Sequence, residues 1–302
     1  MDKQQIDKIL DGFYTSKSQQ TALLYQSDLD SFRDYLGVDN LQAALVSFFE
    51  SPHSQANLTV LHYKSLMHRD GLKPATINRR LSALRSLVKG ARRDGHLRWE
   101  LDVSNVKKSS AQKNALLSSD NFDAILGLAG NQRNPLKSAR DIAILRLFHD
   151  LALQRSSVVN LDYSDINFAE NWIAVKVPGT RGKINKFLPT KTADSLRHWL
   201  SYRGKNKGPL FTNCDHAGKG KRLSGTSIYR TVRRFGEKIG IETGPFGIRQ
   251  TAIIKALDKA KVAGIKIADI AAFSDHQHLS SLKAYNKKRA QIQQRLSDLV
   301  SE

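Results

Sequence analysis

The stretch DHQHLSSLKAY, residues 275–285, places His276 nine positions before Tyr285. A tyrosine taken alone is usually a packed aromatic side chain. A phenol has a pKa near ~10, so it attacks phosphorus only with cations and a proton acceptor close by. Two candidate cations, Arg155 and Arg249, lie upstream in the sequence.

The two arginines lie in short segments that interrupt the surrounding helical pattern. Arg155 follows an apolar helix end in ALQRSS, residues 152–157, and Arg249 follows a Gly-containing loop in PFGIRQT, residues 245–251. An arginine can donate to two phosphate oxygens at once and keeps its proton. Phosphodiester cleavage depends mainly on stabilising charge in the transition state. The four residues together therefore predict a site that binds and attacks one phosphodiester.

The charge of the chain indicates what carries that phosphodiester. The 48 basic and 28 acidic residues give a net charge of +20, which favours nucleic acid first and a membrane surface second. Residues 70–108 hold ten basic and four acidic side chains, whereas residues 1–69 hold six and eight. A local excess is more typical of a contact surface than of general solubilisation, which is the plainer alternative.

Residues Pro74–Gly95 form the best-defined predicted helix of the first half. Pro74 suits the first helical turn, and an apolar stripe runs at three- and four-residue steps from Ile77 to Ala91. Basic residues occupy the other positions, and Asp94 is the only acidic residue in the segment. We expect this face to contact DNA rather than to be a solvated charged face. The predicted DNA-binding residues are Arg79, Arg80, Arg85, Lys89 and Arg92.

Several classes of protein are excluded. Cys214 is the only cysteine, so no disulfide forms within the chain and a cytoplasmic location fits, with the protein on the nucleoid when it binds DNA. No segment resembles a signal peptide or approaches the ~20 apolar residues of a membrane-spanning helix. There is no HExxH, no metal-site spacing beyond His276-x-His278, and no GxxxxGK[ST]. We expect no metal or nucleotide cofactor.

The pattern along the chain predicts a mainly α, α+β protein. A polar, basic stretch around residues 107–114 is typical of a linker between a helical domain, 1–106, and a second domain, 115–302. In the second domain, helices are expected at 119–130 and 136–153 and again from Thr190 onward. Between them, 172–177 and 186–189 read as strands of a small antiparallel sheet, joined by a turn at 178–183.

At these residues the chain resembles the tyrosine recombinase, or phage integrase, family of the Xer-like type. The spacing from His276 to Tyr285 matches that family's LGHxxxxTTxxY box, with Ser274-Asp275-His276 for Leu-Gly-His. The segment around Arg155 resembles the GLRxSE box, and FGIRQT, residues 246–251, resembles HxLRHT. Residues 21–32 and 75–85 resemble the start and the DNA-facing helix of the family's core-binding domain. The likeness covers nearly the whole chain in the right order.

The resemblance implies a DNA breaking-rejoining enzyme fold and a site-specific recombinase that needs no ATP. Arg155 and Arg249 would clamp the scissile phosphate, His276 would hydrogen-bond it, and Tyr285 would form a 3′-phosphotyrosyl link. The partner would be double-stranded DNA, bound by a homo-tetramer on paired sites, with accessory proteins as a further expectation. The reaction would be integration, excision or resolution.

The resemblance also implies a lysine in the β-hairpin that protonates the leaving 5′-oxygen. Counting back from Leu188-Pro189, the family position falls on Arg181, which holds its proton too tightly for a general acid. We therefore favour Lys183, with Lys186 as a weaker candidate and solvated hairpin charge as the alternative for all three.

Three departures from the family pattern are Phe246 and Gln250, which replace histidines, and Val158, which replaces a glutamate. Phe246 can neither donate nor accept a proton at a position that helps to manage the tyrosine's proton. It motivates a second reading, a catalytically impaired DNA-binding accessory protein of recombinase descent. A metal-dependent nuclease and a topoisomerase-like enzyme are more distant alternatives.

Overall fold

The computed structural model describes residues 1–107, 117–215, 218–276 and 282, and the chain divides into two compact units. The N-terminal unit spans Met1–Gln112 and the C-terminal unit Lys113–Glu302. The prediction of a mainly helical protein with a small antiparallel sheet is confirmed. Within the described ranges, no helix is both long and apolar enough to cross a membrane.

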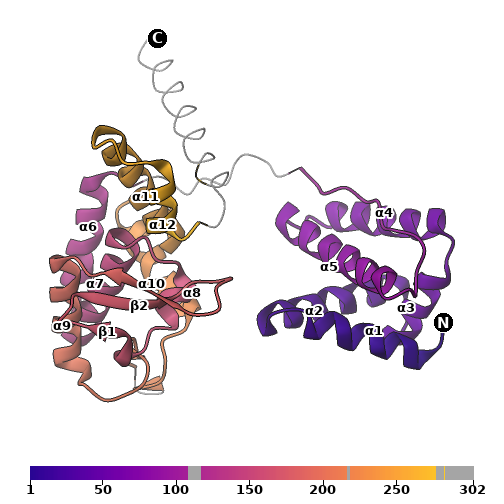
Figure 1. Cartoon of the computed structure of the whole chain (residues 1–302), viewed down its shortest axis with the longest axis horizontal. Helices are drawn as coiled ribbons and strands as arrows, with labels where there is room; N and C mark the ends of the chain where they lie inside the picture. Colours follow the sequence, from indigo (N-terminus) through magenta and orange to yellow (C-terminus); the bar gives the residue numbers. More distant parts are fainter. Residues whose placement is uncertain (108–116, 216–217, 277–281, 283–302) are drawn as a thin grey trace, which may run out of the picture. The chain divides into compact units, whose positions relative to one another are not determined.

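The N-terminal unit is helical throughout its described secondary structure (Figure 1). Its helices are α1 (Lys3–Thr15), α2 (Gln19–Leu36), α3 (Leu41–Glu50), α4 (His53–Arg69) and α5 (Pro74–Arg93). Helix α5 packs against α1, α2 and α4. The stripe predicted for it is buried: Ile77, Leu81, Leu84, Val88 and Ala91 are at most 2% exposed. The helix ends two residues before the predicted Gly95, which adopts φ +80°.

The C-terminal unit is built around α7 (Pro135–Asp150), which packs against α6 (Ser119–Gly130), α9 (Thr190–Arg203) and α11 (Pro245–Val262). Buried residues of α7 follow one another almost continuously from Ala139 to Phe148, so the helix is covered on most sides. The remaining helical elements are α8 (Arg155–Val159), η1 (Tyr163–Asp165), α10 (Gly225–Lys238) and α12 (Ile267–Ser274).

A three-stranded antiparallel sheet lies in this unit in the order β1 (Ile166–Asn167), β2 (Trp172–Lys176) and β3 (Lys183–Phe187). The predicted strand 172–177 is thus close to β2, but the predicted turn is too long. Lys183 belongs to β3, where it pairs with Lys176, because the strand starts three residues before the predicted Lys186. In this register Lys186 lies opposite Ile173, which is fully buried, so Lys186 shares the core-facing side of the sheet and Lys183 lies on the other side.

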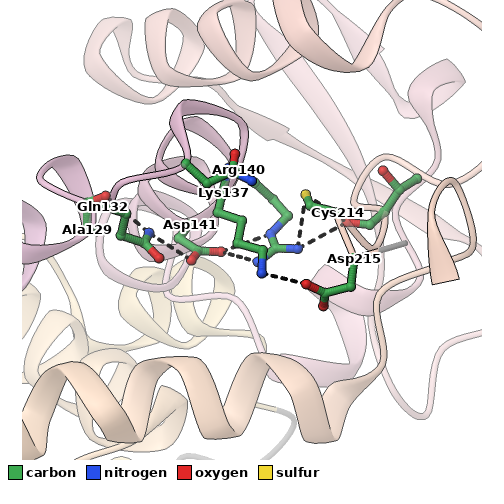
Figure 2. A network of polar contacts seen from close by, with 9 residues as sticks. Ala129, Gln132, Lys137, Arg140, Asp141, Cys214 and Asp215 are labelled. Carbon is green, nitrogen blue, oxygen red and sulfur yellow. Dashed lines mark hydrogen bonds and ion pairs between the residues drawn. The ribbon is translucent and has the colours of Figure 1, made fainter. Parts of the chain in front are cut away.

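The long loop between α9 and α10 is tied to α7 by a polar network that Figure 2 shows. Arg140 and Asp141, both at most 5% exposed, form an ion pair of 2.8 Å. Arg140 also donates to the carbonyl oxygen of Thr212 and to Cys214 Sγ, at 3.2 and 3.3 Å. Lys137 Nζ reaches Asp215 at 2.5 Å. Burial raises the pKa of the Cys214 thiol, although the Arg140 charge works in the opposite direction. The network therefore anchors this loop to the buried helix.

A small second core joins α11 to α12. Its buried members are Ala152, Ala252, Ile253, Leu257, Ala260, Ile270 and Leu282. Leu282 is fully buried in this core and lies three residues before Tyr285 in the sequence.

Candidate active site

Arg155 is the first residue of α8, directly after a sharp change of direction. Helix α7 ends at Asp150, and Ala152 adopts φ +49°, a left-handed conformation that is unfavourable for a residue with a Cβ. Arg155 is exposed, and its guanidinium lies over the ring of Tyr229 in α10, 5.9 Å from the centroid. Such cation–π contacts are worth about 0.5–1 kcal/mol at exposed sites. Tyr229 thus orients the first arginine.

Arg249 lies one turn into α11 and is only 5% exposed. Its Nη1 donates to the carbonyl oxygen of Ala152 and its Nη2 to that of Ser274. The strained Ala152 therefore presents its carbonyl to one arginine three residues before the other, Arg155. These hydrogen bonds fix the orientation of the guanidinium plane.

His276 follows α12 and is held by the same serine. Ser274 Oγ donates to the carbonyl oxygen of Ile270 at 2.6 Å and lies 2.8 Å from His276 Nδ1. A hydroxyl has one proton, so with that proton on the Ile270 carbonyl oxygen Ser274 Oγ is an acceptor for an N–H at Nδ1, the tautomer in which Nε2 is the acceptor of the neutral ring. Burial lowers the pKa of His276, the Arg249 charge lowers it further, and Asp275 opposes both.

The three hairpin candidates for the general acid differ in their contacts. Lys186 Nζ lies 2.8 Å from Asp275 Oδ1 and donates to the carbonyl oxygen of Phe273 at 2.7 Å, beside His276. Lys183 Nζ pairs instead with Asp165, at 2.5 Å, and keeps 40% of its side chain exposed. Arg181 is exposed. Of the three candidates, Lys186 is the one that contacts the segment of Arg249 and His276.

The loop before α11 is packed closely onto α10 at Gly236. The Gly236 carbonyl accepts from the amides of Ile239 and Ile241 at 3.0 and 2.9 Å, so the chain folds back over the helix end. A Cβ at Gly236 would lie 2.6 Å from the Ile241 carbonyl oxygen and 2.7 Å from Thr243 Cγ2. The absence of a side chain there sets the path by which the chain enters α11 and reaches Arg249.

The basic face of α5 is less free than its sequence suggests. Arg79 lies 3.0 Å and Arg80 3.8 Å from the carboxylate of Asp28, which is 2% exposed. Burial raises the pKa of Asp28, against the lowering effect of the two arginines. The expectation that only Asp94 offsets this face is wrong, because Asp28 comes from α2 and further partners lie beyond the helix end.

The remaining predicted residues of α5 differ in their contacts. Arg85 donates to the Val103 carbonyl oxygen at 2.5 Å and to Asn105 Oδ1 at 2.7 Å. Arg92 pairs with Glu100 at 2.5 Å. Lys89 is exposed on the helix surface.

The predicted nucleophile, Tyr285, lies outside the described residues, as do His278 and the rest of residues 277–281. Of the predicted site residues, Arg249 and His276 are brought together, and Arg155 follows the turn whose carbonyl binds Arg249. Phe246 is 54% exposed one turn before Arg249.

Sequence reasoning missed Tyr229, Ser274 and Asp275 as parts of the site. Tyr229 and Ser274 carry no local signal. Asp275 does, because it stands where the resembling LGH box has glycine, and a charged residue there could have prompted a search for its partner.

Comparison with known proteins gives a consistent result. The profile of the Phage integrase family matches residues 116–291, and that of the Phage integrase, N-terminal SAM-like domain matches residues 14–95. A tyrosine recombinase of Synechocystis sp. is 33% identical over 293 residues, covering 95% of this chain and 92% of the relative. A tyrosine recombinase of Synechococcus elongatus is 34% identical over 285 residues, covering 92% and 87%.

Two solved structures share the fold. One is the Tn1549 transposon integrase in complex with transposon right end DNA, with a TM-score of 0.68 at 13% identity over 94% of this chain and 98% of that chain. The other is the XerH site-specific recombinase bound to palindromic difH substrate, with a TM-score of 0.66 at 15% identity over 99% and 95%.

Proposed function

The chain belongs to the phage integrase family and is a tyrosine recombinase, and we propose from this premise that Tyr285 attacks a phosphodiester of duplex DNA. The observation that carries the proposal is the meeting of Arg249 and His276 at Ser274, which sets a cation and an imidazole side by side. The burial of Leu282, three residues before Tyr285, supports it, because Leu282 belongs to the same core as residues of α11 and α12.

The chemistry is a transesterification in two mirrored steps. The oxygen of Tyr285 bonds to phosphorus, the bond from phosphorus to the 5′-oxygen breaks, and the products are a 3′-phosphotyrosyl link and a 5′-hydroxyl. The 5′-hydroxyl of a second strand then attacks that link and releases Tyr285. Each step exchanges one phosphoester for another, so no ATP is consumed. Arg155 and Arg249 stabilise the charge on the nonbridging oxygens.

Two protons must move in the first step. The proton of Tyr285 passes to Nε2 of His276, which the contact with Ser274 leaves as the acceptor of the neutral ring. The resulting imidazolium then donates a hydrogen bond to the phosphate. This route needs no proton acceptor at Phe246.

The leaving 5′-oxygen takes its proton from Lys183. Both lysines form an ion pair, Lys183 with Asp165 and Lys186 with Asp275, but the side chain of Lys183 is 40% exposed and therefore accessible to a substrate, whereas that of Lys186 is 10% exposed. A substrate with sulfur in place of the bridging 5′-oxygen needs no such proton. We expect it to restore cleavage to Lys183→Ala and to leave Arg155→Ala impaired. A sulfur substrate that does not help Lys183→Ala would remove the residue from this role.

We assign the DNA contact of the N-terminal unit to the face of α5 that carries Arg79, Arg80, Arg85, Lys89 and Arg92. The active assembly in this proposal is a homo-tetramer on two paired sites, acting in the cytoplasm, and the reaction is site-specific integration, excision or resolution. Light scattering of the protein on a duplex with paired sites tests the tetramer, because a dimer on the same duplex would contribute half the protein mass.

The decisive test uses a duplex that this protein selects from a randomised library, nicked near the cleavage point so that the cleaved end diffuses away. The parent should form a covalent DNA adduct that survives denaturation, and Tyr285→Phe should bind equally well without forming it. An adduct formed by Tyr285→Phe would refute the assignment.

Phe246 favours one other function, that of a DNA-binding accessory protein without cleavage. That reading predicts specific binding and no adduct with the parent protein. Under that reading the parent has no cleavage activity, so Phe246→His, which supplies a second imidazole, either stays inactive or gains the ability to form the adduct.

A further inference from the structure

Lys186 forms the most buried Lys–carboxylate ion pair of the described C-terminal unit. Its Nζ lies 2.8 Å from Asp275 Oδ1, and the two side chains are 10% and 4% exposed. The same nitrogen donates to the carbonyl oxygen of Phe273 at 2.7 Å and reaches that of Ala272 at 3.5 Å. An ammonium has three donors, and each of them therefore meets an acceptor at the end of α12.

Asp275 occupies an unusual place in the chain. It caps α12 with φ +55°, in the left-handed region that glycine adopts at little cost and aspartate tolerates. The LGH box that this segment resembles has glycine there. The chain thus carries a charged side chain where backbone geometry alone would favour none, and that side chain reaches across to β3.

The segment held by this pair is the one that organises the active site. Ser274, between Phe273 and Asp275, accepts from Arg249 through its carbonyl oxygen and from His276 through its hydroxyl. A shift of the segment would therefore move both the arginine and the imidazole. Lys186 belongs to the same hairpin strand as Lys183, so the ion pair also joins the strand of the proposed general acid to that segment.

We propose that Lys186 and Asp275 are positioning residues whose ion pair locks β3 to the end of α12 and holds Arg249 and His276 in place for the phosphate. The inference rests on the proposed function of this site. Neither residue touches the reacting atoms. Lys186 also compensates the Asp275 carboxylate, which would otherwise be an unpaired buried anion beside a site that must accept a phosphate.

This charge relation predicts an asymmetry between variants. Lys186→Met keeps the aliphatic stem but leaves Asp275 buried and unpaired. Asp275→Asn keeps the size of the side chain and leaves Lys186 with two carbonyl acceptors. The methionine variant should therefore be the more impaired, and the double variant should recover much of its loss.

The test measures the single-turnover rate of adduct formation and the dissociation constant on the nicked, library-selected duplex, with all three variants. Lys186→Met should slow adduct formation at least ~10-fold while the dissociation constant changes by less than ~3-fold, and the double variant should be faster than Lys186→Met. Recovery in the double variant would trace the loss to the unpaired Asp275 carboxylate, and the small change in the dissociation constant would distinguish it from a general loss of folded protein. The matched control is the Lys137–Asp215 pair, a Lys–Asp contact that joins two distant segments elsewhere in the unit. Lys137→Met and Asp215→Asn should leave the rate unchanged.

Hydrogen–deuterium exchange without DNA supplies a second readout. The amide of His276 is bonded to the Ala271 carbonyl oxygen at 3.0 Å, so a released segment exchanges faster. Exchange in residues 267–276 should accelerate in Lys186→Met and slow again in the double variant. Parental rates and parental exchange in both single variants would overturn the proposal while leaving the proposed function intact. If the parent forms no adduct, the proposed function fails, and exchange alone then decides whether the ion pair positions the segment.

Discussion

Gly236→Ala tests how the loop before Arg249 is held. In most helices this exchange stabilises, because alanine exceeds glycine in helix propensity by about 1 kcal/mol. At Gly236 the new Cβ would meet the Ile241 carbonyl oxygen at 2.6 Å and Thr243 Cγ2 at 2.7 Å. The first of these atoms belongs to the backbone, so it cannot rotate away as the end of a flexible side chain can.

The magnitude follows from two opposed terms. Overpacking of a buried site costs typically about 1–3 kcal/mol, and a backbone overlap of this depth belongs at or beyond the upper end. After the gain in propensity is subtracted, the free energy of unfolding should fall by about 2 kcal/mol. For a unit of this size each kcal/mol shifts Tm by about 2–4 °C, so the transition of the C-terminal unit should move down by about 4–8 °C.

Calorimetry or tryptophan fluorescence of the full chain measures this shift, since Trp172 and Trp199 belong to the C-terminal unit. The matched control is Gly127→Ala in α6, where a Cβ would meet nothing within 4 Å. That variant should melt at or slightly above the parent. A Gly236→Ala protein that melts as high as Gly127→Ala would refute the reasoning.

Four further predictions concern charged groups and their partners. Lys89→Ala should weaken DNA binding and lower the slope of log K against log salt by about 1, because one phosphate contact is lost, and an unchanged slope would contradict it. Arg85→Ala should in addition lower the free energy of unfolding by about 1–3 kcal/mol in a denaturant titration, since it also removes hydrogen bonds within the protein. Tyr229→Ala should slow adduct formation roughly 2–5-fold through loss of the Arg155 contact, while Tyr229→Phe, which keeps the ring, should stay near the parent. The folded state lowers the pKa of His276, so the unfolded state binds the proton first and stability is lost as pH falls through about 6.5. As the pH is lowered from 7.5 to 5.5, the Tm of the parent should therefore fall more steeply than the Tm of His276→Asn. Parallel plots of Tm against pH for the two proteins would argue against this.

Local pattern was sufficient for much of the fold. The apolar stripe of residues 77–91 predicted α5 and its buried face, because helical spacing alone determines which residues share a side. The predicted helix 119–130 coincides with α6 for the same reason. Arg249 and His276 were identified from short boxes, and the structure brings them together at Ser274.

What the pattern could not supply were partners distant in sequence. Asp28 precedes Arg79 by about fifty residues, and periodicity says which face of a helix is polar but not what lies against it. The hairpin shows the same limit. Lys183 read as part of a Gly-containing turn, yet its pairing with Lys176 extends β3, since strand ends depend on cross-strand contacts more than on the residue itself.

The carboxylate of Asp28 has a consequence for any polyanion that meets α5. A solvent-exposed arginine samples many rotamers, and immobilising it costs up to about 2 kcal/mol in lost freedom. Arg79 and Arg80 are already anchored from beneath when the helix folds. A polyanion that binds this face would therefore contact side chains whose rotamers are already restricted. Binding would then cost less conformational entropy than binding to the same number of mobile basic side chains.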